Sequence, residues 1–418
     1  MRRTGTLVLT LVVLLTAASS TAASLRDGAV AVRAGRAAPD DSALARRLAR
    51  ALRVPHVSRS ESAAVAVDLG TGEELFALND TRPMAPASNE KLALTFALLT
   101  TLSPNLRIET TVKAIGTREG ATLRGGLALV GGGDPTLTSG DLLELARRVR
   151  AAGIRRITGG VLGDESLFDA KRTCPGWKSS FYMNESPPLS ALVVDRAWYR
   201  TYTARRPAKA AALLFRDALR AAGVSVEGNV AVRTSPPEAA VIAKTRSAPL
   251  ASIVSFMDLH SDNFTAEELL KLLSLTIAER GSSASGAQVV MSALADAGIP
   301  TAGVRIFDGS GLSERDRLTT GALVGILQAL ADDPALESVL LRALPVAGVS
   351  GTLRYRMQKP PVFGHVVAKT GTTSLASALS GYVKHRYVFS VLQNGFPVSF
   401  AWARTAQDRF AAVLAASE

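Results

Sequence analysis

The chain has 418 residues, more than one hydrophobic core usually holds, so we expect two domains or one domain with an insertion. Apolar residues make up 47% of it and aromatic residues 5%, a globular composition that excludes general disorder. The net charge of +12 would suit a polyanion, but the sequence has no cysteine–histidine zinc pattern and no basic helix interleaved with aromatic residues. We therefore expect no nucleic-acid partner.

The N-terminus has the features of an export signal. Arg2 and Arg3 precede an apolar run over residues 7–15, and small residues follow over 16–24. This pattern predicts a signal peptide over residues 1–23, because the apolar run is too short to span a bilayer; an uncleaved anchor is the alternative. Residues 24–42 are expected to form a flexible leader. The mature protein would be extracellular, periplasmic or cell-wall-associated.

Export bears on the charge and on the single cysteine. In an exported chain the positive charge favours association with anionic wall polymers or a membrane surface, although a composition rich in Arg explains it equally well. Cys174 has no partner for an intramolecular disulfide. We expect it to be a buried apolar side chain rather than a nucleophile, because no histidine lies near it in the sequence.

The first folded elements are a helix, a hairpin and a second helix. The helix is expected over residues 44–52, and two alternating runs at 63–69 and 74–78, joined by a glycine turn, predict the hairpin. After a Pro-rich approach, Ser88 begins the second helix, whose apolar positions recur at helical spacing at Leu92, Phe96 and Leu99.

The middle of the chain changes to short strands with glycine turns, interleaved with helices. Strands are expected at 107–115, 123–130 and 157–162, and helices at 141–152 and 208–222. We interpret residues 106–244 as a domain inserted in a main domain formed by residues 43–105 and 245–418.

The last third completes the main domain. A helical region begins at 249–259, and three strands are expected at 365–369, 376–383 and 387–393. A terminal helix follows, with one apolar face formed by Trp402, Ala406, Phe410, Val413 and Leu414. The fold class is therefore α+β: an antiparallel sheet flanked by N- and C-terminal helices, an all-helical part, and an inserted second domain.

The sequence Ser88-Asn89-Glu90-Lys91 has the S-x-x-K form. Positions three apart on a helix share a face, so the Ser88 hydroxyl and the Lys91 amine can meet. A buried lysine can lose its proton and then activate the serine. Alone, this motif occurs often by chance.

Two further motifs follow in the order that S-x-x-K enzymes require. Ser261-Asp262-Asn263 matches S-D-N and Lys369-Thr370-Gly371 matches K-T-G. The first motif opens a helix, the second lies in a helical region and the third on a predicted strand. Their joint appearance is much more specific than any one of them.

With these motifs the chain resembles the penicillin-recognising serine D,D-peptidases, and within them the low-molecular-mass D-alanyl-D-alanine carboxypeptidase/endopeptidases. The resemblance runs from about residue 45 to 415. Outside the three motifs it is carried by Gly133-Asp134-Pro135-Thr136-Leu137, Pro175-Gly176-Trp177, Val194-Asp195-Arg196, Asp308-Gly309-Ser310-Gly311-Leu312-Ser313, Pro345-Val346-Ala347-Gly348 and Leu379-Ser380-Gly381-Tyr382.

The resemblance implies the roles of the motif residues. Ser88 would be acylated by the penultimate D-alanine of a peptidoglycan stem peptide, with Lys91 as its general base and Ser261 as the proton relay to the leaving amine. Asn263 would hold the substrate amide, and Lys369 with Thr370 would face the terminal carboxylate. Lys369 would also place a second cation near Lys91 and so favour its neutral form.

The same resemblance implies the remaining partners and contacts. The oxyanion hole would use the backbone N–H groups of Ser88 and Thr372. Gly371 would leave room for a ligand along the strand. D-Alanyl cross-links are further candidate substrates, β-lactams are the expected covalent inhibitors, and neither a metal nor a cofactor is expected.

Two alternatives remain open, a β-lactamase and a catalytically silent wall-binding protein. A class A β-lactamase needs a glutamate that holds the deacylating water, and Glu185 is the nearest stand-in, although we expect it to be a solvated loop residue. The chain also departs from the family pattern. Ser261 follows Ser88 by only 173 positions, and we expect that a segment is missing between Arg196 and Pro207.

Overall fold

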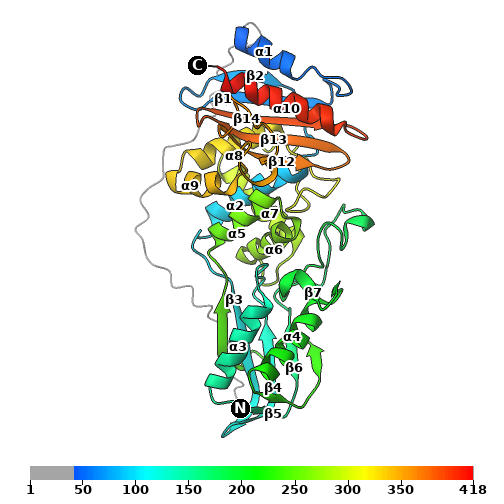
Figure 1. Cartoon of the computed structure of the whole chain (residues 1–418), viewed down its shortest axis with the longest axis vertical. Coiled ribbons are helices and arrows are strands. Elements are labelled where there is room, and N and C mark those ends of the chain that lie inside the picture. Colours follow the sequence, from blue (N-terminus) through cyan, green and yellow to red (C-terminus); the bar gives the residue numbers. More distant parts are fainter. Residues whose placement is uncertain (1–41, 418) are drawn as a thin grey trace, which may run out of the picture.

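The computed structural model describes residues 42–417 and shows an elongated molecule with two large β-sheets, one near each end, and a small two-stranded sheet (Figure 1). The predicted signal peptide and residues 24–41 of the predicted leader lie outside the described residues. None of the helices between residues 42 and 417 is both long and apolar enough to cross a membrane.

The sheet of the main domain is antiparallel throughout and has five strands in the order β12-β13-β14-β1-β2. The predicted hairpin is β1 (Ser62–Asp68) and β2 (Glu74–Leu78). The three strands predicted near the C-terminus are β12 (Val366–Thr372), β13 (Ala376–Val383) and β14 (Tyr387–Asn394). Every residue of β1 and β13 is buried, because both faces of the sheet are covered.

The two terminal helices cover one face of this sheet. They are α1 (Ala43–Ala51) and α10 (Phe400–Ala415), which lie side by side at the top of Figure 1. The Phe410 ring lies 5.7 Å from Phe76 and 6.2 Å from Phe389, between ring centroids. Of the predicted apolar face of α10, Trp402 and Val413 are only partly buried.

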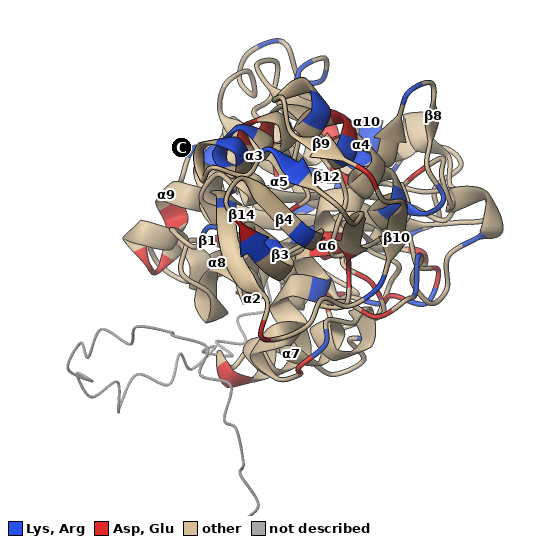
Figure 2. Cartoon of the chain, turned by 90° about the horizontal axis from the view of Figure 1, so that it is seen from below, with Lys and Arg blue, Asp and Glu red and all other residues tan. Residues whose placement is uncertain are grey.

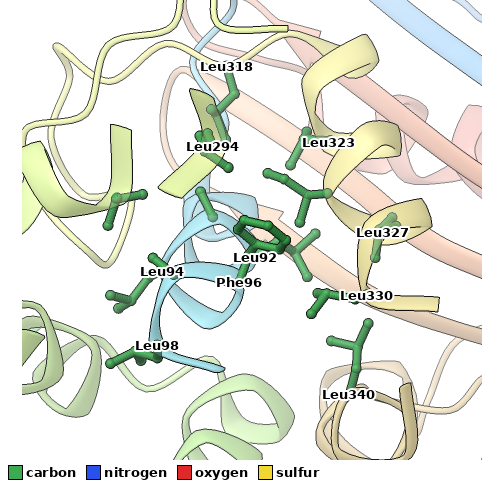
Figure 3. Close-up of a cluster of buried hydrophobic side chains, with 14 of the residues drawn as sticks. Leu92, Leu94, Phe96, Leu98, Leu294, Leu318, Leu323, Leu327, Leu330 and Leu340 are labelled. Atoms are coloured by element: carbon green, nitrogen blue, oxygen red, sulfur yellow. The ribbon is translucent and has the colours of Figure 1, made fainter. Parts of the chain in front are cut away.

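Helices cover the other face. They are α2 (Glu90–Thr101), α5 (Leu250–His260), α6 (Asn263–Leu273), α7 (Ser283–Asp296), α8 (Thr320–Ala331) and α9 (Pro334–Ala343). Helix α2 is their centre, and it is buried on all sides over residues 90–99. Figure 3 shows Leu92 and Phe96 of α2 facing leucines of α8 on one side. This close packing fixes the position of the residues that precede α2.

The inserted domain has its own sheet and its own hydrophobic core. The main strand order is β10-β6-β4-β3-β11, in which parallel and antiparallel pairs are mixed, and β5 and β9 extend it. The strands are β3 (Glu109–Glu119), β4 (Thr122–Val130), β5 (Arg156–Ile157), β6 (Val161–Asp164), β9 (Ser225–Val226), β10 (Val230–Val232) and β11 (Ala240–Arg246). The helices α3 (Ser139–Ala151) and α4 (Pro207–Ala221) pack against this sheet.

The fold class is the α+β arrangement predicted from the sequence. Two local details differ. The strand predicted over 157–162 is divided into β5 and β6 by a bend at residues 158–159. Beside this bend the backbone packs closely, since a Cβ atom at Gly160 would lie 1.8 Å from the Asn229 carbonyl oxygen. Strand β11 continues to Arg246, past the predicted domain boundary at residue 244. The boundaries of the inserted domain otherwise stay a prediction.

Candidate active site

The three sequence motifs meet where the start of α2, the junction of α5 and α6, and the strand β12 come together. Lys91 Nζ lies 3.1 Å from Ser88 Oγ and 2.9 Å from Asn263 Oδ1. Lys369 Nζ lies 2.8 Å from Ser261 Oγ. The five side chains predicted to be catalytic are therefore assembled in one place.

Ser88 lies in η2 (Ala87–Asn89), the single 3₁₀ turn that leads into α2. Ala87 has a φ of 47°, which is uncommon for a residue with a side chain. The Asn89 amide donates to Ser380 Oγ at 2.6 Å and so ties this turn to β13. These contacts, together with the buried helix behind them, set the direction of the Ser88 side chain.

Gly371 allows β12 to approach the Ser88 turn. A Cβ atom at this position would lie 2.9 Å from the Pro86 carbonyl oxygen and 3.1 Å from the Ala87 Cβ atom. The reason for glycine is thus close packing of the strand on the turn. This differs from the reason expected from the sequence, which was room for a ligand.

Lys91 is fully buried. Burial lowers its pKa, because the ammonium form loses its hydration, while nearby carboxylates, chiefly Asp308 and Glu267, oppose this effect. Its Nζ atom donates to the Ser310 carbonyl oxygen at 2.7 Å in addition to its contacts with Ser88 and Asn263. A neutral Lys91 could accept the proton of the Ser88 hydroxyl at the observed distance.

Lys369 is also fully buried, and burial together with the nearby Lys91 lowers its pKa to about 7. Its Nζ atom contacts the Thr370 carbonyl oxygen at 3.1 Å as well as Ser261. The sequence predicted that Lys369 would favour the neutral form of Lys91. In the structure, burial is the largest cause of the lowered pKa of both lysines, and the repulsion from Lys91 adds to it at Lys369.

The S-D-N motif forms the junction between two helices. Ser261 ends α5 in a left-handed conformation with a φ of 56°, and Asp262 caps the start of α6 by accepting from the Thr265 N–H at 2.8 Å. Arg196 holds Asp262 with two hydrogen bonds of 3.0 and 2.8 Å. This reversal brings Ser261 toward Lys369 and Asn263 toward Lys91. Arg196 received no role from the sequence analysis, and only its place in the family-like Val194-Asp195-Arg196 segment pointed to it.

The outer edge of β12 presents unpaired backbone groups. Thr373 and Ala376 exchange both of their backbone hydrogen bonds, so Thr373 directs its N–H group toward β13. In an antiparallel strand the direction alternates from one residue to the next, so Thr372 and Thr370 direct their N–H groups away from β13. Ala368 follows the same alternation, since its N–H donates outward to the Pro345 carbonyl oxygen. Because β12 is an edge strand beside the Ser88 turn, the Thr372 N–H lies on the outer edge of the sheet next to that turn.

Two segments that received no role from the sequence also contact the site. The Asp308–Ser313 turn supplies the carbonyl oxygen that Lys91 contacts. In the loop after Cys174, Lys178 contacts Ser374 Oγ of the β12–β13 turn at 3.0 Å and forms a 2.7 Å ion pair with Glu314. Lys178 therefore links the inserted domain to the main domain beside the site.

The remaining candidate groups do not take part in this arrangement. The Glu185 side chain is exposed, and only its backbone carbonyl approaches Asn263, at 3.4 Å. Cys174 is buried and donates to Glu267 at 2.9 Å; burial raises the pKa of its thiol, which disfavours the reactive thiolate. Within residues 42–417 no group of three or more His, Cys, Asp or Glu residues could hold a metal ion.

The site has a serine beside a buried lysine at the start of a helix, and a second serine–lysine pair whose lysine lies on an edge strand. This arrangement defines a penicillin-recognising serine hydrolase. The family model "D-Ala-D-Ala carboxypeptidase 3 (S13)" matches residues 44–206 and 198–417. The chain belongs to this family.

Curated relatives and solved structures agree with this assignment. The chain is 32% identical to a D-alanyl-D-alanine carboxypeptidase of Actinomadura sp. (strain R39), over 82% of this chain and 79% of the relative. It is 34% identical to a carboxypeptidase of Mycobacterium tuberculosis, over 76% and 72%. Penicillin-binding protein 4 from Haemophilus influenzae has the same fold, with a TM-score of 0.78, 22% identity and coverage of 88% of this chain and 98% of that one.

The comparisons also bear on the shortened insertion. The alignment with the Actinomadura relative spans 430 positions, although it covers only 82% of this chain, so it contains gaps. The two segments matched by the family model meet at residues 198–206. This is the place where the sequence indicated a missing segment. In this structure it is the short hairpin of β7 (Trp198–Tyr199) and β8 (Tyr202–Thr203).

Proposed function

We propose that this protein hydrolyses the terminal D-alanyl-D-alanine bond of peptidoglycan stem peptides through an acyl-enzyme on Ser88. The proposal rests on membership of the D-Ala-D-Ala carboxypeptidase family and on relatives that are named for this activity. The observation that carries the assignment of the nucleophile is the 3.1 Å contact between Ser88 Oγ and Lys91 Nζ.

The first half of the reaction is acylation. Neutral Lys91 takes the proton of the Ser88 hydroxyl while Oγ attacks the carbonyl carbon of the penultimate D-alanine. The peptide C–N bond breaks, and the leaving amine of the last D-alanine receives a proton through Ser261. Water then hydrolyses the Ser88 ester, which releases the shortened peptide and restores the hydroxyl. Ser261 suits the relay because its Oγ lies 2.8 Å from the Lys369 ammonium.

The edge of β12 supports the binding of the substrate's C-terminal end. A peptide lying along this edge would meet the outward N–H of Thr372, which together with the Ser88 N–H would stabilise the oxyanion. Lys369 and Thr370 would then attract the terminal carboxylate. The Asn263 amide, fixed by Lys91 through its Oδ1 atom, would bind the substrate's backbone.

β-Lactams would acylate Ser88 in the same way, because their strained amide carbonyl takes the place of the D-alanine carbonyl. The Haemophilus influenzae protein has also been solved with a novel β-lactam, at 23% identity and a TM-score of 0.71. A class A β-lactamase uses a glutamate as its deacylating base. Among the described residues, the candidate for this role is Glu185, and its side chain is exposed. We therefore favour slow deacylation, and hence inhibition rather than rapid turnover.

Covalent labelling tests the nucleophile. We expect a fluorescent penicillin to label one site, and peptide mapping to place the label on the fragment that contains Ser88. The unlabelled protein should release D-alanine from a peptide ending in D-alanyl-D-alanine, and penicillin should block that release. Label on any other fragment would contradict the assignment, and rapid steady-state hydrolysis of a chromogenic cephalosporin would favour a β-lactamase. Sacculus binding without an adduct would favour a silent wall-binding protein.

We also propose that the protein is exported and that the β7–β8 hairpin associates with an anionic wall polymer. Tyr199 and Tyr202 of the hairpin line a hollow of about 280 Å³ together with the cations Arg205, Arg206 and Lys209 at the start of α4. In the described part of the chain, no carboxylate pairs with these three cations. Figure 2 shows this end of the molecule, where Lys and Arg residues lie around α3, α4 and β8.

The polymer proposal predicts a loss of binding when this charge is removed. We expect the double variant Arg205→Ala/Lys209→Ala to lose most of its salt-sensitive sedimentation with purified wall sacculi, because phosphate or carboxylate groups would no longer be neutralised. The matched control is Arg216→Ala/Arg220→Ala, which removes the same charge from within α4, at residues near Asp217. Equal binding by both variants, or binding only to anionic lipid vesicles, would contradict the proposal.

A further inference from the structure

The Asp308–Ser313 turn is organised around one buried carboxylate that the proposed reaction does not use. Asp308 is fully buried. Its two oxygens accept from four N–H groups: those of Ser310 at 3.1 Å, Gly311 at 2.7 Å, Ser313 at 2.7 Å and the Trp177 indole at 2.7 Å. A carboxylate with this many donors determines the path of the turn around it.

A second buried carboxylate holds the same turn from the other side. Glu267 of α6 accepts from the Ser310 N–H at 2.9 Å and from the Gly309 N–H at 3.2 Å. The Gly309–Ser310 peptide is thus held by two acids through the Ser310 N–H, and the next peptide, which carries the Ser310 carbonyl group, is held by Asp308 through the Gly311 N–H at 2.7 Å. The Ser310 carbonyl oxygen points to the opposite side, where it accepts from Lys91 Nζ at 2.7 Å.

The turn also packs against the backbone next to Ser88. Gly311 has a φ of +79°, and a Cβ atom there would lie 1.9 Å from the Ala87 carbonyl oxygen. The turn and the residue before Ser88 are therefore in direct contact. One rigid segment touches the proposed base through a carbonyl group and the proposed nucleophile through its neighbouring peptide.

We propose that Asp308 and Glu267 are positioning residues, which act through the Ser310 carbonyl group to hold Lys91 against Ser88. The inference rests on the proposed acylation of Ser88. Neither acid touches Ser88. Glu267 holds the Gly309–Ser310 peptide, and Asp308 holds the next peptide, whose Ser310 carbonyl group contacts Lys91. Displacing this peptide would move the Lys91 amine, and small displacements of a base cost a large part of its effect.

The charges around Lys91 make the proposal testable by pH. The ionisable groups that face it from the surrounding elements are Glu90, Asp258, Asp262, Glu267, Asp308 and Lys369. Asp308 and Glu267 raise the pKa of Lys91 against the effect of burial. Burial raises the pKa of Glu90 well above its usual range, so we expect Glu90 to be neutral at neutral pH. Removing the charge of Asp308 should therefore lower the pKa of Lys91.

The experiment measures the rate of acylation by a fluorescent penicillin as a function of pH. For Asp308→Asn we expect the maximal rate to fall about tenfold or more, because an amide nitrogen replaces one oxygen that faces N–H donors. We expect the acidic limb of the profile to move to lower pH by about one unit. Glu267→Gln keeps an acceptor oxygen and should show a smaller shift of the acidic limb in the same direction. The shift is smaller because the pKa of Glu267 is raised to about 7, so this carboxyl group is only partly ionised near neutral pH.

Glu268→Gln is the matched control. Glu268 lies next to Glu267 on α6, is equally buried, and accepts from the Ser190 N–H at 2.8 Å rather than from the Asp308–Ser313 turn. Its variant should leave the acidic limb in place. An unmoved limb in a folded Asp308→Asn or Glu267→Gln protein would overturn the inference, as would an equal shift in Glu268→Gln. If Asp308→Asn does not fold, the Glu267→Gln profile decides. Absence of label on Ser88 in the unmodified protein would instead overturn the proposed function.

Discussion

Replacing Ser88 with alanine should abolish covalent labelling by penicillin and lower D-alanine release by at least about 10⁴-fold. The hydroxyl is the atom proposed to form the acyl bond, and no neighbouring hydroxyl can replace it: Ser261 Oγ lies against Lys369 instead of Lys91. The fold should persist, because the turn that carries Ser88 is held by the Asn89–Ser380 hydrogen bond and by the buried helix α2.

The Ser88→Ala result is read from a gel for the label and from a D-alanine assay for turnover, with circular dichroism to establish that the protein is folded. Ser60→Ala is the control, since Ser60 is exposed on a loop outside the site and should behave as the unmodified protein. Residual labelling of Ser88→Ala at another residue would mean that the nucleophile is misassigned.

Replacing Lys91 with methionine should lower the rate of acylation by about 10³- to 10⁴-fold, because general-base catalysis contributes about this much. Methionine has a similar length but cannot accept a proton. In the unmodified protein the acylation rate should rise with pH through neutrality, as the Lys91–Lys369 pair loses its first proton. This expectation follows from the lowered pKa of both lysines, which is about 7 for Lys369. The variant should lose this rise.

The control for Lys91→Met is a second lysine that is buried but lies outside the site. Lys271 is fully buried and forms a 2.6 Å ion pair with Asp169. Lys271→Met should lower stability, because it leaves Asp169 without its partner, but it should keep the acylation rate and its pH profile. Stopped-flow acylation between about pH 5 and 9 compares both variants. A profile for Lys91→Met that matches the unmodified protein would assign the base to another group.

Local patterns in the sequence were sufficient for much of the fold. The alternating runs at β1 and β2 and the three runs near the C-terminus were found as strands, because period-two alternation reflects the two faces of a sheet. The contact of Ser88 with Lys91 also follows from helical spacing. The division of β5 from β6 could not be predicted from such patterns. At this point the Asn229 backbone approaches Gly160, and the two residues are distant in the sequence.

The functional site was only partly predictable for the same reason. The motif residues Ser261 and Lys369 could be identified, but their 2.8 Å contact joins positions 108 apart, and spacing alone says nothing about such pairs. Arg196 and Glu267 have no sequence signal of their own, because each acts by holding another residue. The extent to which the pKa of each buried lysine is lowered also depends on which carboxylates surround it.

The sequence by itself determined the family, the α+β class and the identity of the reacting side chains, since these depend on residue types at short, regular spacings. Only the tertiary structure decided which buried acids hold Lys91, why Gly371 must be glycine and which backbone N–H groups face the cleft. These properties arise from contacts between segments far apart in the chain, and from the loss of water around charges that such contacts bury.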